Sequence, residues 1–246
     1  MITVCIPAFN EEKNVRGTAL TVLQAARETG VDPIEVIIVD DGSSDGTAAE
    51  IAKLEREFPS IRSITHPRNM GLGRSYMDVI AAAKYGKISL FPGDNSISLY
   101  TIKNVFKNRD KADVIISYYN NTELRSLARH AISTVVNLIY GSTFGVHARY
   151  IQGASCLTTE RVRRLNIFAT EHTIQAEIHV KLIRSGSSYM EVDGYYDPRS
   201  YSNRSVAFRR KTIVNALSAY LNLVHEIFVR HPDLYRHKPV RVLPLP

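Results

Sequence analysis

Residues 34–47, which read IEVIIVDDGSSDGT, decide the fold class of this chain. Ile34–Val39 is a continuous apolar run, the pattern of a strand that is buried on both faces of a sheet. An acidic loop rich in serine and glycine follows it, and helical spacing runs from about Asp45 to Phe58. A buried strand, a polar loop and a helix in this order indicate one unit of a parallel sheet that is covered by helices.

The same alternation continues on both sides of this unit. It predicts strands at residues 2–7, 61–65, 88–91 and 113–117, with helices at 11–28, at 73–85 and after Ser98. The second half changes character, with predicted helices at 125–140 and 170–185 and predicted strands at 149–158 and 188–192. The fold class is therefore α/β: a Rossmann-like, mostly parallel sheet with helices on both faces.

A long amphipathic helix at 206–230 ends the predicted domain, which we place at residues 1–230. The apolar face of this helix consists of Val206, Ile213, Leu217, Tyr220, Leu221, Val224 and Phe228. Residues 231–246 carry three prolines in the last eight positions, which predicts a surface tail.

The composition of the 246-residue chain is that of an ordinary globular protein, because 44% of its residues are hydrophobic and 22% are charged. No apolar run approaches the ~18 residues of a membrane-spanning helix, and the first residues lack the features of a signal peptide. Cys5 and Cys156 lie in apolar runs, which indicates buried thiols and a cytoplasmic protein. The formal net charge of +7 indicates an anionic partner: phosphate groups, nucleic acid or an anionic membrane face.

Four polar loops follow the first four predicted strands, at residues 7–12, 40–47, 67–73 and 92–95. In an open parallel sheet, ligands bind beyond the carboxyl ends of the strands, so we expect these loops to meet and form the site. In the second loop, Ser44 or Asp45 is suited to cap the next helix. Asp40 and Asp41 stand directly at the strand end, where one of two adjacent carboxylates usually faces a hydrogen-bond donor or a cation.

Three segments taken together resemble family 2 glycosyltransferases with the GT-A fold: IPAFNE at 6–11, IVDDGSSDGT at 38–47 and RNMGLG at 68–73. Over roughly residues 1–205, the chain is most similar to the dolichyl-phosphate mannosyltransferase-like branch, which glycosylates polyprenyl phosphates. The resemblance implies that a hexose-type sugar is transferred from a nucleotide-sugar with inversion of the anomeric carbon. It also implies a donor-binding half at 1–117, an acceptor-side half at 118–205 and a separate C-terminal helix.

The resemblance implies seven nucleotide-sugar-binding residues in the first three loops: Pro7, Phe9, Glu11, Asp40, Asp41, Asn69 and Gly71. In the family, the first loop frames the base and the ribose. The aspartate that matches Asp40 contacts the nucleoside, and Asp41 matches its partner near the nucleotide. Asn69 and Gly71 match the loop beside the base. Uracil and guanine both suit these loops, so the expected donor is a UDP- or GDP-sugar.

The fourth loop falls where the family has an Asp-x-Asp metal motif. In this sequence Pro92 replaces the first aspartate, which leaves Asp94 as the single carboxylate of the motif. Because Mg²⁺ commonly takes few protein ligands, we expect Asp94 to hold Mg²⁺ or Mn²⁺ with modest affinity. Such a cation stabilises the charge of a departing diphosphate, so Asp94 is a catalytic candidate as well as a donor-binding one.

Five residues of the second half are candidates for holding an acceptor phosphate: Arg125, Arg129, Arg199, Ser202 and Arg204. Residues 199–205 resemble the family's Arg-x-x-Gly-x-Ser segment, although Ser202 stands where glycine is usual. The fork of an arginine matches phosphate geometry, which makes Arg199 a catalytic candidate. A polyprenyl phosphate is already an anion near neutral pH and needs no general base. A hydroxyl of a growing cell-surface glycan does need one, and Glu171 is the candidate.

Other functions and contacts stay open from the sequence. A basic run at residues 209–211 favours reversible contact with the cytoplasmic face of a membrane, and the alternative is a C-terminal helix that packs on the protein's own core. A non-catalytic nucleotide-sugar-binding subunit is the alternative to an enzyme, because Pro92 departs from the motif. A nucleotidyltransferase is disfavoured because residues 7–12 contain neither glycine nor arginine. Nucleic-acid binding is disfavoured because no recognition motif is present.

Overall fold

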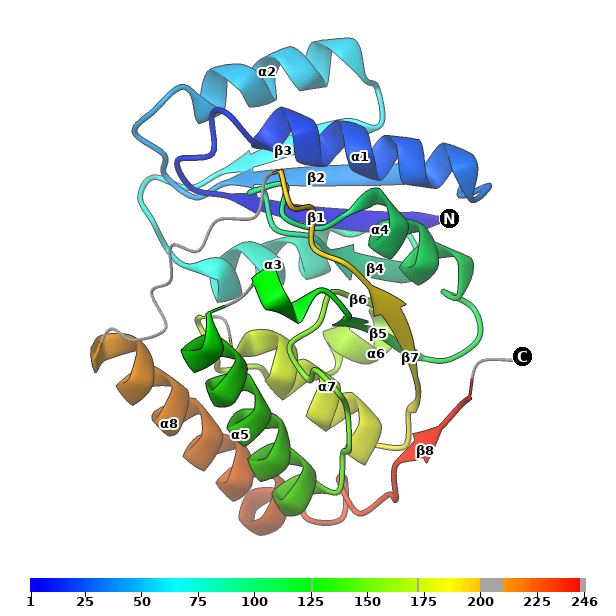
Figure 1. Cartoon of the computed structure of the whole chain (residues 1–246), viewed down its shortest axis with the longest axis vertical. Coiled ribbons are helices and arrows are strands. Elements are labelled where there is room, and N and C mark those ends of the chain that lie inside the picture. Colours follow the sequence, from blue (N-terminus) through cyan, green and yellow to red (C-terminus); the bar gives the residue numbers. More distant parts are fainter. Residues whose placement is uncertain (125, 172, 200–209, 244–246) are drawn as a thin grey trace.

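The computed structural model describes residues 1–124, 126–171, 173–199 and 210–243 (Figure 1). Within these ranges, eight strands form one sheet in the order β3-β2-β1-β4-β6-β5-β7-β8. They are β1 (Ile2–Ala8), β2 (Ile34–Asp40), β3 (Ile61–Thr65), β4 (Lys87–Leu90), β5 (Val114–Tyr119), β6 (Ser155–Thr158), β7 (Ser188–Gly194) and β8 (Val240–Arg241). Only β6 runs antiparallel to its neighbours, so the predicted mostly parallel α/β sheet is confirmed.

Helices cover both faces of this sheet. They are α1 (Val15–Glu28), α2 (Thr47–Glu57), α3 (Leu72–Ala82), α4 (Leu99–Lys107), α5 (Leu127–Phe144), α6 (Thr159–Arg163), α7 (Ile174–Arg184) and α8 (Arg210–His225), with the short turns η1 (Thr122–Leu124) and η2 (Glu226–Arg230). Alternate residues of β1 point to opposite faces. Val4 and Ile6 therefore pack in the core that contains α1, α2 and α4, whereas Cys5 packs in the core that contains α3, α5, α7 and α8.

The two cysteines are buried and free, as the sequence predicts. Burial in apolar surroundings disfavours the thiolate and raises the pKa of the Cys156 thiol to about 11. None of the described helices has the length and apolar character that crossing a membrane requires.

The carboxyl-terminal segment differs from the predicted surface tail. Val240–Arg241 forms β8 and pairs in parallel with β7, and the Val242 N–H donates to the Tyr189 carbonyl at 2.7 Å. Tyr235 is only 2% exposed and belongs to the core around α7 and α8. Most of residues 231–243 are exposed, as expected of a surface tail, but the short strand and the buried Tyr235 were not predicted, because a two-residue strand has no readable period.

Two element boundaries in the second half also differ from the prediction. The strand expected at 149–158 is limited to Ser155–Thr158, and the short helix α6, which was not predicted, follows it directly. The C-terminal helix is described from Arg210 onward and ends in a π-helical turn at Glu226–Arg230, while residues 206–209 lie outside the described residues.

The C-terminal helix packs only part of its predicted apolar face, Tyr220 and Val224, against the core. Leu223 and Ile227 are each 1% exposed, and Tyr220 and Val224 pack against the same core. Four residues of the predicted face are exposed instead: Ile213, Leu217, Leu221 and Phe228. The seventh, Val206, lies outside the described residues. Because the helix carries apolar residues on more than one side, spacing alone could not select the buried stripe.

Candidate functional site

The loops that follow β1 and β2 interlock at the carboxyl edge of the sheet. The Asn10 N–H donates to Ser43 Oγ at 2.9 Å, and the Ser44 N–H donates to Asn10 Oδ1 at 2.8 Å. The backbone of Asn10 is left-handed, with φ of 57°, a conformation that asparagine tolerates better than most residues. The Glu11 N–H donates to Thr47 Oγ1 at 2.8 Å, which ties the first loop to the start of α2. The expected meeting of these two loops is confirmed.

Asp40 and Asp41 are adjacent at the end of β2 but have different hydrogen-bond partners. Both residues are 4% exposed. Asp40 Oδ1 accepts the Ser43 N–H at 3.0 Å, and Asp40 Oδ2 accepts no hydrogen bond from the described part of the chain. Both oxygens of Asp41 accept backbone N–H groups, from Met70 at 2.8 Å and from Gly71 at 2.9 Å. Asp40 thus keeps an acceptor for a ligand, whereas Asp41 is committed to the next loop.

The rest of the second loop is fixed by local contacts. Asp45 Oδ1 accepts the Thr47 hydroxyl at 2.5 Å and the Thr47 N–H at 3.0 Å, so Asp45 receives the first N–H of α2 as a capping residue would. These bonds, the hydroxyl bond first, lower the pKa of the Asp45 carboxyl. Gly42 has φ of +72°, and a Cβ there would lie 2.4 Å from the Arg68 carbonyl carbon. Glycine therefore lets the second loop lie directly against the third.

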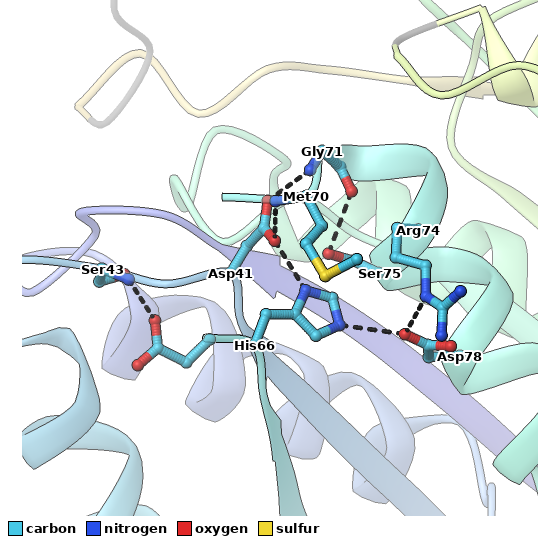
Figure 2. A network of polar contacts seen from close by, with 9 residues as sticks. Asp41, Ser43, His66, Met70, Gly71, Arg74, Ser75 and Asp78 are labelled. Atoms are coloured by element: carbon cyan, nitrogen blue, oxygen red, sulfur yellow. Dashed lines mark hydrogen bonds and ion pairs between the residues drawn. The ribbon is translucent and has the colours of Figure 1, made fainter. Parts of the chain in front are cut away.

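A histidine that the sequence did not single out joins the second loop to α3 (Figure 2). His66 Nδ1 lies 2.7 Å from Asp41 Oδ1, and His66 Nε2 lies 3.0 Å from Asp78 Oδ2. The Arg74 Nε–H also donates to Asp78 Oδ2, at 2.8 Å. The sequence offered no signal for this network, because its members are far apart along the chain and form no motif.

The third loop, with Asn69 and Gly71, packs against the segment that leads to α7. The Gly73 N–H donates to the Thr170 carbonyl at 2.9 Å. Gly71 has φ of +90°, and a Cβ there would lie 2.9 Å from the same carbonyl oxygen. The side chain of Asn69 is exposed at the loop surface, as is that of Phe9 in the first loop. The structure therefore brings the predicted residues of three loops to one edge.

The fourth loop lies beside the first. The Gly93 N–H donates to the Pro7 carbonyl at 3.0 Å, and Asp94 Oδ1 accepts the Ser96 N–H at 3.0 Å. Burial raises the pKa of the Glu11 carboxyl, and the negative charges of Asp94 and Asp45 raise it further. Glu11 and Asp94 are therefore close enough to repel each other.

The carboxylates of Glu11 and Asp94 are candidates for holding a divalent cation. The described residues contain no group of three or more side chains that could hold a metal ion. Asp94 Oδ2 accepts no hydrogen bond within the described ranges, and its charge raises the pKa of Glu11, a repulsion that a cation would relieve. The residues present fit a cation such as Mg²⁺ that takes few ligands from the protein.

Arg199 is placed next to the fourth loop. The Asp197 N–H donates to the Ser96 carbonyl at 2.8 Å, which ties the segment before Arg199 to the loop that contains Asp94. Arg199 Nη2 and Nε donate to the Asp197 carboxylate at 2.8 and 3.1 Å, and its side chain is 89% exposed. This pairing lowers the pKa of the Asp197 carboxyl.

Arg129 lies in the first turn of α5, which follows a segment that is tied to the same region. Asn121 and Tyr196 exchange hydrogen bonds of 2.8 and 2.9 Å between the Asn121 amide and the Tyr196 backbone. The approach to α5 therefore lies beside the segment that carries Arg199. The other three predicted phosphate ligands, Arg125, Ser202 and Arg204, lie outside the described residues.

Glu171 is half-buried and lines a small polar cavity of about 120 Å³ between residues 168–173 and α8. The α8 side of this cavity is formed by Asn215, Ser218, Ala219 and Asn222, which the sequence analysis did not single out. The carboxyl of nearby Glu177 has a different environment. It is paired with Lys181 Nζ at 2.6 Å and accepts the Ala169 N–H at 2.8 Å, so Glu177 holds the segment before Glu171 in place.

Comparisons with known proteins agree with this architecture. The putative glycosyltransferase EpsH of Bacillus subtilis (strain 168) is 30% identical over 122 residues, which are 48% of this chain and 33% of that protein. The dolichyl-phosphate beta-glucosyltransferase ALG5C of Trichomonas vaginalis is 36% identical over 75 residues, which are 29% of this chain and 22% of that protein. The chain thus spans a third or less of the length of these two relatives.

The fold is similar to that of glucosyl-3-phosphoglycerate synthase from Mycobacterium tuberculosis, solved in complex with Mn²⁺ and UDP-glucose. The TM-score is 0.69 at 16% identity, with 91% of this chain and 79% of that chain covered. This likeness bears out the expected GT-A type of sheet. The model of the family described as Glycosyl transferase family 2 matches residues 3–169, which is more than half of the chain, so the chain belongs to glycosyltransferase family 2.

Proposed function

We propose that this chain transfers a hexose from a nucleoside diphosphate sugar to a polyprenyl phosphate, with inversion of the anomeric carbon. One observation carries the donor half of the proposal. At the end of β2, Asp40 keeps one carboxylate oxygen that accepts no hydrogen bond from the described residues, while the adjacent Asp41 fixes the loop beside it. A buried acceptor at the carboxyl edge of a parallel sheet suits the N–H or hydroxyl groups of a nucleoside.

The three interlocked loops supply the other nucleoside contacts. Phe9 in the first loop and Asn69 in the third present exposed side chains, and Pro7, Glu11 and Gly71 fix the backbone that carries them. Because these loops are held by hydrogen bonds within the protein, little ordering is left for the nucleotide to induce. A panel of UDP- and GDP-hexoses distinguishes uracil from guanine as the base.

Departure of the nucleoside diphosphate leaves negative charge near Asp94. A divalent cation held by Asp94 would stabilise that charge as it develops. Within the described residues, Asp94 Oδ2 accepts no hydrogen bond and is available for this task, and the nearby carboxyl of Glu11 has its pKa raised by burial and by Asp94. Pro92 removes the second carboxylate of the family motif, so the cation affinity is modest.

The acceptor half of the proposal is supported by charge and by proximity. Arg199 uses Nε and Nη2 for Asp197, which within the described residues leaves Nη1 for an acceptor phosphate beside the Asp94 loop. A phosphate oxygen held there attacks the anomeric carbon as the diphosphate leaves, and no proton has to move. ALG5C, a relative over part of the chain, is named for glucosyl transfer to dolichyl phosphate, an acceptor of this class.

A lipid acceptor requires approach to a membrane, and α5 and α8 offer a surface for it. The two helices lie side by side (Figure 1), with Thr143 Oγ1 and the Tyr220 hydroxyl 2.7 Å apart and the Phe144 and Phe228 rings stacked at 6.0 Å. Large apolar side chains are exposed along both helices: Leu127, Ile132, Val135, Leu138, Ile139, Ile213, Val214, Leu217 and Leu221. We name these nine residues the α5–α8 apolar face. Such a face, on a protein with a net charge of +7, suits the surface of an anionic bilayer.

A hydroxyl acceptor on a cell-surface glycan is the second candidate, and the cavity beside Glu171 favours it. Asn215, Ser218 and Asn222 line that cavity together with Glu171, and their amide and hydroxyl groups suit the hydroxyls of a sugar. In this reading, the Glu171 carboxylate takes the proton of the attacking hydroxyl.

A donor panel followed by transfer tests the proposal. Thermal shift with UDP- and GDP-hexoses, with and without Mg²⁺ or Mn²⁺, should reveal one stabilising donor, since a ligand that binds only the folded state raises Tm. That donor, labelled in the sugar, should then be converted to a lipid product with a short polyprenyl phosphate. Binding without transfer to any acceptor would favour a non-catalytic subunit, and transfer to a glycan alone would favour the second candidate.

A further inference from the structure

His66 is a buried histidine whose two ring nitrogens both face carboxylates. It is 6% exposed, and it follows β3, where its N–H donates to the Asp40 carbonyl at 2.9 Å. The charged groups that face the ring are Asp41 from the loop after β2 and Asp78 from α3, with Arg74 behind Asp78 (Figure 2). No other histidine of the described chain lies between two carboxylates at these distances.

The hydrogen-bond roles of Asp41 and Asp78 determine which ring nitrogens of His66 carry an N–H. An ionised carboxylate only accepts hydrogen bonds, whereas a neutral imidazole has one N–H and one acceptor nitrogen. Asp41 already accepts two backbone N–H groups, and Asp78 already accepts from the Arg74 guanidinium, so both carboxyls act as acceptors. His66 therefore satisfies both neighbours only as an imidazolium, with an N–H on each ring nitrogen.

The contact between His66 and Asp41 affects the Asn69–Gly71 loop, because Asp41 also binds the backbone of that loop. The same Asp41 oxygen that contacts His66 accepts the Met70 N–H, and its other oxygen accepts the Gly71 N–H. If His66 releases Asp41, the carboxylate is free to turn, and the loop loses its two bonds to Asp41. Asn69, which we place beside the base, is part of that loop, and its side chain makes no hydrogen bond to another described residue.

We propose that His66 is a positioning residue for donor binding: as an imidazolium bridging Asp41 and Asp78, it fixes the Asn69–Gly71 loop in the geometry that receives the nucleoside. The inference rests on the proposed function, because it assumes that this loop meets the nucleotide. His66 itself does not touch the donor or the reacting atoms. A side chain that cannot donate to both carboxylates breaks at least one of the two bridges, so donor affinity should fall when His66 is replaced.

His179 provides a matched control. It is fully buried in α7, its Nδ1 lies 2.7 Å from the Ile151 carbonyl oxygen, and its Nε2 has no partner among the described residues. Burial lowers the pKa of His179 to about 4, so His179 is a buried histidine that carries no charge at neutral pH. The two residues share type and burial and differ in their carboxylate neighbours.

The experiment measures the Kd of UDP and of GDP with Mg²⁺ by calorimetry in the wild type, His66→Gln, His66→Phe and His179→Gln. Loss of charge-assisted hydrogen bonds should raise Kd about tenfold in His66→Phe, with partial rescue in His66→Gln, whose amide can still donate to one carboxylate. In turnover, KM for the donor should rise while kcat stays within about threefold.

Several outcomes would overturn the inference. Equal Kd values in the wild type and His66→Phe would do so, as would an equal loss of affinity in His179→Gln, which would indicate general destabilisation. If phenylalanine prevents folding, His66→Gln and Asp78→Asn decide by the same criteria. Failure of the wild type to bind either nucleotide would remove the proposed function itself, and the inference with it. Binding that is insensitive to His66 would remove the inference alone.

Discussion

The donor side and the acceptor side of the candidate site are built in different ways. On the donor side, the loops after β1, β2 and β3 hold one another through the hydrogen bonds of Asn10, Asp41 and Thr47, and Gly42 allows the closest approach. On the acceptor side, Arg199 is 89% exposed with a single carboxylate partner, and α5 and α8 present a wide apolar face to solvent.

This contrast indicates which of the two sides has its geometry fixed by contacts within the protein. The donor loops are fixed by hydrogen bonds to one another, so substitutions there should act on affinity and charge stabilisation and leave the rest of the fold intact. The acceptor side consists of exposed surfaces, which under our proposal contact the acceptor and a membrane. Substitutions there should change transfer or localisation while donor binding stays normal, and four predictions test this division.

The largest expected effect belongs to Asp94 on the donor side. Asp94→Ala should lower the rate of transfer at least ~10²-fold, the scale of removing one electrostatic stabiliser of a developing charge. Turnover of the wild type should also fall when a chelator removes divalent cations. Initial rates with a labelled sugar nucleotide, measured across a Mg²⁺ titration, provide the check. Full activity of Asp94→Ala in excess metal would remove Asp94 from the site, and full wild-type activity in chelator would remove the cation but not the fold.

The second prediction concerns Arg199 and sharpens the choice of acceptor. If a phosphate is the acceptor, Arg199→Ala should lower kcat/KM for the acceptor between about tenfold and a hundredfold, because a hydrogen bond to a charged group is lost. Glu171→Gln should then be nearly silent, since a phosphate anion needs no base. Both variants should bind the donor normally in calorimetry.

Arg230→Ala is the control for this pair. Arg230 is also an exposed arginine beside a carboxylate, with Nη1 3.8 Å from Glu226 Oε2, but it lies at the far end of the C-terminal helix. Its loss should leave transfer unchanged. Survival of transfer to a polyprenyl phosphate in Arg199→Ala, with a ~10²–10⁴-fold collapse in Glu171→Gln, would refute the phosphate acceptor and favour the hydroxyl.

The third prediction concerns Asp40. Asp40→Asn should raise the Kd of the nucleoside diphosphate about tenfold, because the amide is a weaker acceptor than a carboxylate for the donors of a nucleoside. Calorimetry measures the affinity, and circular dichroism confirms the fold.

Asp113→Asn is the matched control for Asp40. Asp113 is a carboxylate at the opposite, amino end of β5, where Oδ2 accepts the Ser188 N–H at 3.0 Å. The control should lose some thermal stability and keep the wild-type affinity. An unchanged Kd in Asp40→Asn would show that Asp40 Oδ2 does not contact the nucleotide. It would contradict the assignment of Asp40 to the donor side.

The donor side was also the more predictable half from the sequence, for a physical reason. Its strand, loop and helix follow one another along the chain, so a contiguous stretch such as residues 34–47 carries both the fold signal and the acidic residues. The bridge from Asp41 through His66 to Asp78 escaped prediction because only folding brings these residues together. A strand pattern also does not reveal direction, so the antiparallel β6 could not be foreseen.

The acceptor side was harder for a related reason. The reciprocal bonds of Asn121 and Tyr196 join segments that are distant in sequence, and no local pattern indicates them. The buried stripe of α8 was only partly predicted because the helix is apolar on two sides, and only the position of α5 and α7 decides which side is covered. That second apolar side is the feature that the last prediction tests.

The smallest expected effect is at the α5–α8 apolar face. Leu217→Gln combined with Leu221→Gln should weaken binding to anionic liposomes, because each half-exposed leucine contributes roughly 1 kcal/mol when it enters the bilayer surface, or about fivefold in affinity. Added salt should weaken binding of the wild type and the double variant alike, since the electrostatic part of the attraction is screened. Flotation at low and high salt measures both effects.

Leu20→Gln is the control for the double variant. Leu20 is 39% exposed on α1, which covers the opposite face of the sheet, so its loss should leave flotation unchanged. Transfer to a water-soluble short-chain polyprenyl phosphate should stay normal in the double variant, while transfer to a long-chain acceptor in liposomes should fall with binding. A wild type that does not bind anionic liposomes even at low salt would contradict the membrane assignment. A protein partner would then be the better explanation for the exposed leucines. Contact with a lipid surface would no longer distinguish the acceptor side from the donor side.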